Sequence, residues 1–394
     1  MLHVDVIVVG AGPAGAVAAQ RLAASGVQVA LLDQATFPRD KPCGDGVMAE
    51  GLAVLERSGL AAWLTQFQVM ELLRLTSPDG QVLDIDLRIP DEHIGRLIPR
   101  RRLDAQLAQL AVEAGAHLLE GSRVRQVRLQ AAAPLEVAAN GFTLTAQIVI
   151  LADGSHAPIT HSLGLVWERP ELLAIRQYLV GDDGPANRLE IHFQSSIIPG
   201  YDWLFPVGEG RVNVGTGTYT RRIYGKAVDL CHELECFVRD PVTAARLAHT
   251  EPVGPIQGHP LRTNLKATHT HAGRVLVVGD AAGLVSPFTG EGIAAALRSG
   301  ELAAAQALLA LEQGDFSAAA LSPYSRALWD RYGVDQMAAR MLRLVLSNPA
   351  LLNRVFRKMR SEADLALLFG QVFLDKKSPR LALRPTTLLR LLAG

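Results

Sequence analysis

Cysteine is scarce in this 394-residue sequence, which contains only Cys43, Cys231 and Cys236. An odd number of cysteines without a pairing pattern argues against a disulfide framework and favours a reducing compartment. The placement of His232 between the last two cysteines matches no zinc motif, so we predict buried thiols and no metal site there. We therefore expect a cytoplasmic protein held together by a hydrophobic core, which 49% apolar residues can supply.

An excess of charge is also missing, because 39 Lys and Arg balance 39 Asp and Glu. Without a basic surplus we expect no nucleic-acid partner. Long apolar runs are absent too: the longest helical one, 302–311, has about half the length of a membrane span. No basic segment precedes the first apolar run, which contains Asp5, so we expect no signal peptide. The protein is expected to be soluble, or at most peripheral on the inner face of a membrane.

The clearest positive feature is a glycine turn near the N-terminus, Gly10-Ala11-Gly12-Pro13-Ala14-Gly15. A strand-like run, 4–9, precedes it, and a helical pattern, 16–25, follows it. A second strand-like run, 27–32, ends at Asp33. This order of elements forms the dinucleotide-binding fingerprint.

Each position in the fingerprint has a physical role. Gly10 permits the tight turn, Gly12 lets backbone N–H groups approach a pyrophosphate, and Gly15 lets helix and strand pack closely. The helix N-terminus stabilises the phosphate charge. Asp33 is placed to accept hydrogen bonds from an adenosine ribose, and Ala14 belongs to the same cofactor-binding turn.

The stretch 37–46 is too rich in Pro and Gly for helix or strand, and it ends in Pro42-Cys43-Gly44-Asp45-Gly46. We interpret it as a shaped loop that holds the far end of a cofactor, with a plain surface connection as the alternative. A helix is predicted at 47–58.

A second helix, 99–115, begins with Arg100, Arg101 and Arg102. Cations at a helix N-terminus oppose the macrodipole. We therefore expect a partner anion for at least one of these arginines, with a solvated surface run as the alternative.

Two kinds of strand and helix pattern alternate along the sequence. Strands at 72–76 and 82–87, and alternating patterns from about 160 to 267, predict a mostly antiparallel domain with one substantial helix at 222–239. Patterns typical of parallel sheets precede and follow this domain. We predict an α/β plus α+β architecture in three parts. The discontinuous nucleotide-binding domain comprises 1–70, 98–160 and 268–330, the inserted substrate domain comprises 71–97 and 161–267, and the helical C-terminal region comprises 331–394.

Buried-looking strands at 147–151 and 274–278 end in Asp153-Gly154 and Gly279-Asp280. A long helix, 289–311, then follows, with Thr289 as its expected cap. The tail, 331–394, contains 12 Lys and Arg against 4 Asp and Glu, a net charge of +8. Its amphipathic helices either pack with a solvated basic face or lie on an anionic bilayer.

Three aromatic residues, Tyr201, Trp203 and Phe205, alternate along a strand predicted to end at Pro206. Alternate residues of a strand share one face, so these side chains form an aromatic wall. Such a wall suits a flat or apolar ligand, and plain core packing is the alternative.

The glycine turn, Asp153-Gly154 and Gly279-Asp280 together resemble the glutathione-reductase-like flavoproteins, in the branch with a para-hydroxybenzoate-hydroxylase-type fold. This resemblance covers roughly 1–330 and implies FAD as the cofactor. It implies that Asp280 hydrogen-bonds the ribityl chain. It also places Arg100, with Leu103 and Asp104, at the family's Arg-x-x-(Phe/Leu)-Asp position beside the pyrophosphate or ribityl region.

The start of the long helix favours a flavin on physical grounds. N–H groups at Gly290, Gly292 and Ile293 would face the pyrimidine edge of the ring, where reduced flavin carries negative charge. Pro287 would hold the preceding turn against the ring. A glycine-rich helix start that merely allows close packing is the alternative.

Two further stretches resemble the geranylgeranyl reductase family. The loop 42–46 is similar to its Pro-Cys-Gly-Gly/Asp-Gly loop. The stretch 201–206, followed after eight residues by Gly215-Thr216-Gly217, matches its Tyr/Phe-x-Trp-x-Phe-Pro…Gly-x-Gly signature. Members reduce isolated double bonds in prenyl chains of archaeal lipids, chlorophyll precursors or menaquinone.

The resemblance implies hydride transfer from flavin N5 to one alkene carbon and a proton to the other. Tyr201 is the candidate acid, Trp203 and Phe205 are candidate walls beside a cationic carbon, and Cys43 is a flavin-proximal residue of open role. With no second fingerprint, electrons would come from NAD(P)H bound transiently or from ferredoxin. The alternatives are a flavin monooxygenase or halogenase, although the halogenase stretch Trp-x-Trp-x-Ile-Pro is absent, and a flavin-free chaperone of prenylated partners.

Overall fold

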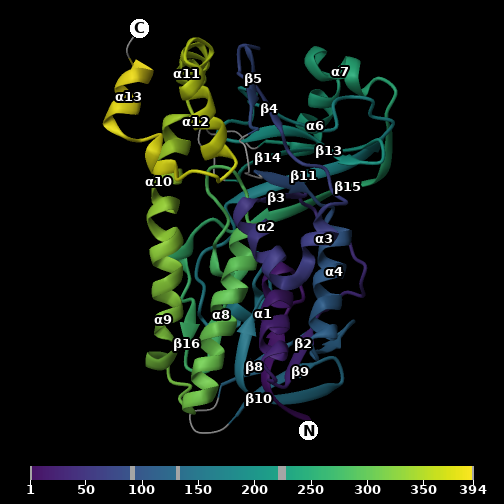
Figure 1. The fold of residues 1–394 in the computed structure, drawn as a ribbon, viewed down its shortest axis with the longest axis vertical. Coiled ribbons are helices and arrows are strands. Elements are labelled where there is room, and N and C mark those ends of the chain that lie inside the picture. The colour runs from purple at the N-terminus through teal and green to yellow at the C-terminus, as the bar shows by residue number, and fades with distance from the viewer. Residues whose placement is uncertain (1, 89–93, 130–133, 221–227, 393–394) are drawn as a thin grey trace.

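The computed structural model describes residues 2–88, 94–129, 134–220 and 228–392 (Figure 1). Two sheets lie one above the other in the view of Figure 1, with the N-terminus at the lower end. The lower sheet has the strand order β16-β17-β10-β1-β2-β7, and β9 and β8 extend it from β10. Its strands are β1 (Leu2–Val9), β2 (Val29–Leu32), β7 (His117–Leu119), β8 (Gln126–Arg128), β9 (Leu135–Ala139), β10 (Phe142–Leu151), β16 (His271–Ala272) and β17 (Val275–Val277).

Helices cover one face of this lower sheet (Figure 1). They are α1 (Pro13–Ala24), α4 (Arg100–Glu113), α8 (Ile293–Gln313) and α9 (Ala318–Leu328). Residues 6–9 of β1 and 148–151 of β10 are continuous apolar runs because both faces of the sheet are buried there, as in parallel sheets. The predicted strand, helix and strand around the glycine turn are confirmed by β1, α1 and β2.

The parallel register brings three distant turns to one edge of the lower sheet. Val9 of β1 pairs with Leu151 of β10, and Leu151 pairs with Val277 of β17. The turns that follow these strands therefore meet at their carboxyl ends, at the point where the strand order reverses around β1. This is where open α/β sheets bind their ligands.

The upper sheet is mostly antiparallel, as predicted, with the order β15-β11-β14-β13-β12-β4-β5. Only the β12–β4 pairing within it is parallel among the described residues. Its strands are β4 (Leu72–Thr76), β5 (Val82–Asp86), β11 (Leu172–Val180), β12 (Arg188–His192), β13 (Tyr201–Gly208), β14 (Arg211–Tyr219) and β15 (Glu251–Leu261). β13 runs beyond Pro206, where the prediction ended it, because Pro206 still pairs with Val212.

Two short helices cover part of this sheet, α6 (Leu230–Val238) and α7 (Pro241–Leu247). The predicted helix 222–239 starts in residues that lie outside those described, and its described part begins at Leu230. The second helix, α7, was not predicted, although Asp240 as N-cap and Pro241 at the first position are a recognised start signal. Cys231 and Cys236 on α6 are exposed, so the prediction of buried thiols is wrong.

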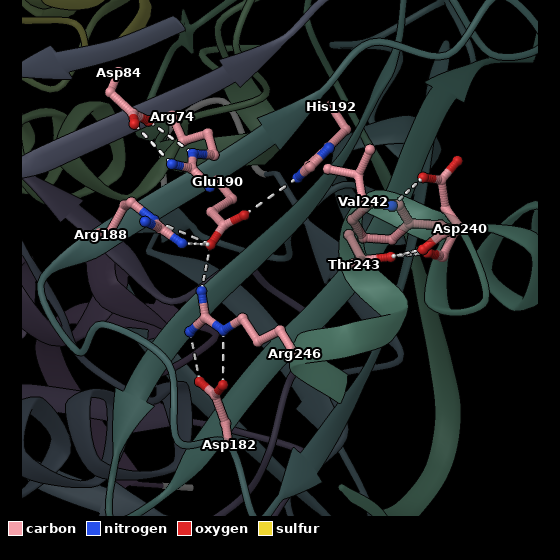
Figure 2. A network of polar contacts seen from close by, with 11 residues as sticks. Arg74, Asp84, Asp182, Arg188, Glu190, His192, Asp240, Val242, Thr243 and Arg246 are labelled. Carbon is pink, nitrogen blue, oxygen red and sulfur yellow. Dashed lines mark hydrogen bonds and ion pairs between the residues drawn. The ribbon is translucent and has the colours of Figure 1, made fainter. Parts of the chain in front are cut away.

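A buried ionic network ties α7 to the upper sheet (Figure 2). Glu190 of β12 accepts hydrogen bonds from Arg188 and from Arg246 of α7, and Arg246 also pairs with Asp182 at 2.6 Å. Burial opposes ionisation of Glu190, but the nearby His192 (3.6 Å), the hydrogen bonds from Arg188 and the charge of Arg246 lower its pKa to about 2. The carboxylate therefore stays charged and holds helix and sheet together.

Two corrections concern the segments between the sheets. The predicted helix 47–58 begins only at α2 (Ala49–Leu55), because β3 (Gly46–Met48) first pairs with β6 (Gly95–Leu97). The strand predicted at 147–151 starts earlier, because β10 runs without a break from Phe142 to Leu151. Two shorter helices, α3 (Ala61–Leu64) and α5 (Pro158–Ser162), complete this part.

The C-terminal region is helical, as predicted, and packs beside the upper sheet (Figure 1). It contains α10 (Val334–Val345), α11 (Pro349–Ser361), α12 (Ala363–Phe373) and α13 (Pro385–Leu392). Phe356 and Phe369 join Leu73 and Ile85 of the sheet in one buried cluster. None of the helices in the described part of the chain has both the length and the apolar character needed to cross a bilayer.

Candidate active site

A cavity of about 1350 Å³, counting its opening to solvent, lies between the two sheets. The loop 41–46 and the first residues of α8 line one side, and strands β11, β13 and β14 line the other. Of the predicted site residues, those in the lining are Cys43, Gly44, Arg100, Tyr201, Trp203, Phe205, Asp280, Gly290, Gly292 and Ile293. The others lie outside it: Gly10, Gly12, Ala14, Gly15, Asp33, Asp45, Asp153, Gly154 and Pro287.

The three aromatic residues of β13 line this cavity together, as their alternation indicates. Trp203 is fixed by a hydrogen bond from its Nε1 to Oδ1 of Asn213 (3.0 Å). Phe205 lies against Gly44, where an added Cβ would come within 3.2 Å of its ring. The loop and the aromatic wall therefore pack directly on each other.

A polar clamp joins the loop 41–46 to the upper sheet. Asn213 donates to the carbonyl oxygen of Cys43 (2.7 Å) and to Oδ2 of Asp45 (2.8 Å). The hydroxyl of Tyr178 donates to the same oxygen (2.6 Å), and the backbone N–H of Arg100 donates to Oδ1 (3.1 Å). Burial raises the pKa of Asp45 to about 6, although these donors favour its charged form. Sequence reasoning missed Asn213 and Tyr178, because only the pairing of β11 with β14 brings them to the loop.

Cys43 and Tyr201 both keep their protons at neutral pH. Burial raises the pKa of the Cys43 thiol, with Arg100 acting against it, and burial also raises the pKa of Tyr201. The Tyr201 hydroxyl donates to the backbone carbonyl of Thr289, in the turn before α8. The aromatic wall is thereby linked to the helix start on the opposite side of the cavity.

The start of α8 differs from the prediction. The helix begins at Ile293, and Thr289 does not cap it. Thr289 instead accepts from the N–H of Glu291 (3.2 Å) and donates to Asp375 (3.1 Å), while Glu291 accepts from the N–H of Ala294 (2.8 Å). Glu291 lines the cavity, and burial together with Asp375 raises its pKa to about 8. Sequence reasoning did not single out Glu291, because its acidic neighbour comes from the C-terminal region.

The partner anion expected for the arginine run belongs to the chain itself. Arg100, buried at the start of α4, makes a two-point ion pair with Asp104 (2.7 and 2.8 Å). Arg39 also contacts Asp104 (2.7 Å). Arg102 lies over the ring of Phe67 at 4.4 Å. Arg100 also lines the cavity, so part of its positive charge, which Asp104 does not fully neutralise, acts on the site.

Asp280 lies in the cavity wall at the end of β17. It accepts from the hydroxyl of Ser155 (2.9 Å), and Lys41 lies 3.6 Å away. Burial raises its pKa, but the charge of Lys41 and the hydrogen bond from Ser155 outweigh this and hold the pKa below its usual value. Next to it, His259 stays neutral because burial and Lys41 lower its pKa to about 4.

The other two acids fix the turns in which they sit. Asp33 accepts from the N–H groups of Ala11 and Ala35 (both 2.8 Å). Asp153 accepts from the N–H groups of Ile159 and Thr160 (2.8 and 3.0 Å) at the start of α5. The Asp153 carboxylate thus stabilises α5 and does not line the cavity. Asp33 retains lone pairs for a further donor.

The cofactor-binding turn fits a dinucleotide. Among the described residues no side chain caps α1, and a Cβ added at Gly12 would contact only Arg39, at 3.8 Å. Its helix N-terminus and a nearby cation therefore suit a pyrophosphate. The Nε2 atom of His259 is buried in the cavity wall and has no hydrogen-bond partner among the described residues, which leaves it available to a ligand.

Comparison with known proteins agrees with this geometry. A family model described as an FAD binding domain matches residues 3–184. The menaquinone reductase of Mycobacterium tuberculosis is 33% identical over 370 residues, which cover 88% of this chain and 85% of that protein. Digeranylgeranylglycerophospholipid reductase 1 of Methanopyrus kandleri is 33% identical over 333 residues, covering 82% and 85%. A solved geranylgeranyl bacteriochlorophyll reductase-like protein from Thermoplasma acidophilum has a TM-score of 0.83 at 23% identity, covering 97% of this chain and 99% of that one.

The solved structure supports the fold, and the two enzymes extend the likeness over most of both sequences. The matched FAD domain contains the glycine turn, the loop 41–46 and Arg100. The signature stretch of β13 lies beyond that domain but within the cavity that faces it. The chain binds FAD and belongs to the geranylgeranyl reductase family of FAD-dependent oxidoreductases.

Proposed function

We propose that this protein reduces isolated C=C bonds in the prenyl chain of a lipid or a prenylquinone. The observation that carries this proposal is the aromatic wall of β13, which shares one largely apolar cavity with Asp280 and the start of α8. Such a cavity can accept an extended hydrocarbon chain along its aromatic wall. The names of the two related reductases support a substrate of this class.

We further propose how the cofactor is divided between the residues. Gly10, Gly12, Ala14, Gly15 and Asp33 would hold the adenosine and pyrophosphate, within a domain formed by 1–70, 98–160 and 268–330. Cys43 to Asp45, Arg100 and Asp280 would hold the ribityl chain and the ring. The turn from Pro287 to Ile293 would face the pyrimidine edge, with Asp153-Gly154 supporting the pyrophosphate side. Once reduced, bound FAD would supply the hydride for the reaction.

The substrate domain, 71–97 and 161–267, would supply the acid and the walls. Tyr201 would deliver the proton from its hydroxyl to the second alkene carbon, since its buried phenol stays protonated. Protonation leaves positive charge on the first alkene carbon, which accepts the hydride, and the rings of Trp203 and Phe205 would stabilise that charge. Cys43 would shield the site from water on the side of the loop 41–46. Electrons would reach the flavin from NAD(P)H or ferredoxin.

The test is anaerobic reduction of the FAD-loaded protein, followed by mass spectrometry of added prenyl lipids and quinones. We expect products heavier than the substrate by multiples of two hydrogens. A product that contains oxygen or halogen instead would overturn the proposal and favour a monooxygenase or halogenase.

The same assay with Tyr201→Phe tests the acid. We expect turnover to fall about 100-fold or more, because a positioned acid contributes at least that much. FAD content should stay that of the wild type. If reduced Tyr201→Phe enzyme turns over at the wild-type rate, Tyr201 is not the proton donor.

The clamp at Asp45 predicts a pH dependence. Both carboxylate oxygens of Asp45 accept hydrogen bonds, so a proton taken up below a pH of about 6 must displace one donor and loosen the loop 41–46. We expect turnover to fall as the pH is lowered through about 6. An Asp45→Asn variant should be less active at every pH and lack this step. A step of unchanged size in that variant would assign the titration to another group.

A further inference from the structure

Every exposed residue of α10 is apolar. The five side chains, 39% to 59% exposed, form what we call the α10 stripe: Val334, Met337, Met341, Leu344 and Val345. Their spacing of mostly three to four residues places them along one side of the helix. The remaining residues of α10 are buried or half-buried. A continuous apolar stripe facing water marks an interaction surface.

The opposite side of α10 is fixed to the cavity wall. The Arg343 guanidinium lies 3.8 Å from the ring centroid of Tyr219, which lines the cavity. Arg340 donates to the carbonyl of Thr263 (2.9 Å). Gln336 donates to the carbonyl of Gly283 (2.7 Å) and accepts from the N–H of Leu265 (3.1 Å). One helix thus carries the stripe on its outer side and helps to hold the wall of the substrate cavity on its inner side.

The C-terminal region that contains the stripe carries a net positive charge. Residues 331–394 carry 12 Lys and Arg against 4 Asp and Glu, which leaves +8 there and −8 on residues 1–330 of a neutral chain. Exposed cations of this region include Arg360, Lys377 and Arg384. Trp329, just before α10, is 37% exposed, and indole rings favour the interface between water and lipid. An apolar stripe within a basic region suits an anionic bilayer better than a neutral partner.

We propose that the α10 stripe docks on the surface of a bilayer that contains anionic lipids, so that the cavity takes its substrate from the membrane. The proposal rests on the proposed function, because it gives the prenyl substrate a source. The stripe would enter the boundary between headgroups and acyl chains. The basic residues of 331–394 would remain at the headgroups.

The test uses FAD-loaded full-length protein and flotation with phosphatidylcholine vesicles, with and without phosphatidylglycerol. We expect the wild type to float with the anionic vesicles. A Met341→Glu, Leu344→Glu variant should bind these vesicles at least about tenfold more weakly, because two apolar contacts are lost and two negative charges are added. Both side chains are 59% exposed, so the fold should be retained, and a thermal melt checks this.

A matched control replaces two exposed apolar residues by glutamate at positions outside the stripe. Val112 on α4 and Leu309 on α8 are 41% and 49% exposed, and Val112→Glu, Leu309→Glu should float like the wild type. Equal flotation of the stripe variant and the wild type would overturn the proposal. So would a wild-type dimer that the stripe variant dissociates, because a second copy would then cover the stripe.

A second readout separates this proposal from the proposed function. Detergent-solubilised prenyl substrate should be reduced equally well by the wild type and the stripe variant, since the cavity is unchanged. If only the wild type floats and neither protein reduces the substrate, the proposed function fails and the docking surface stands.

Discussion

Replacing Gly215 by alanine is expected to lower turnover about 100-fold while FAD remains bound. A Cβ at this position would lie 2.1 Å from Cζ2 of Trp203 and 2.5 Å from the carbonyl oxygen of Ile175, so the indole must move. Its bond to Asn213 would then break, and Asn213 also holds the loop 41–46. Displacing reacting groups by about 1 Å is enough for a loss of this size.

Gly217→Ala is the matched control on the same strand. Its added Cβ would come no closer than 3.2 Å to a neighbour, the Cβ of Ala174, so the aromatic wall should keep its shape. Turnover with reduced enzyme and FAD content from the flavin absorbance are measured for both variants. Equal turnover of the two would show that the position of Trp203 does not limit the reaction.

Replacing Arg100 by leucine is expected to lower the free energy of unfolding by about 3 kcal/mol. The change leaves Asp104 buried without its two-point partner, and breaking a buried ion pair costs about 3–5 kcal/mol. We expect the lower end because Arg39 still contacts Asp104. Denaturant unfolding measures the loss.

The double variant Arg100→Leu, Asp104→Leu separates structure from cofactor binding. With both charges removed, the stability should return towards that of the wild type, because apolar pairs often replace buried ion pairs at no cost. FAD affinity, measured by titration of the apoprotein, should stay weakened in both variants if Arg100 also contacts the cofactor. Full recovery of FAD affinity in the double variant would limit Arg100 to a structural role.

The lower sheet could be predicted because its signals are local. Gly10, Asp153 and Asp280 each follow an apolar run, and parallel pairing alone brings such ends to one edge. The aromatic wall was likewise predictable from the alternation of Tyr201 and Trp203 along one strand.

The contacts that join these parts were not predictable, because they depend on which strands and helices meet. Asn213 carries no motif of its own, and its three hydrogen bonds exist only because β14 lies beside both β13 and the loop. Asp33 and Asp153 were expected at the cofactor, yet their carboxylates also bind their own turns. The sequence indicates that an acidic residue is needed at such a turn. It does not indicate which carboxylate oxygens already accept hydrogen bonds from the protein backbone.

The buried cluster that unites Leu73 and Ile85 with Phe356 and Phe369 has a kinetic consequence. These contacts join residues separated by more than half of the chain, and contacts of such long range slow folding because a large loop must close first. During synthesis the apolar side chains at this edge of the upper sheet stay uncovered until the C-terminal helices have left the ribosome. The nucleotide-binding turn at residues 10–15, by contrast, is translated together with the helix and strand that it joins.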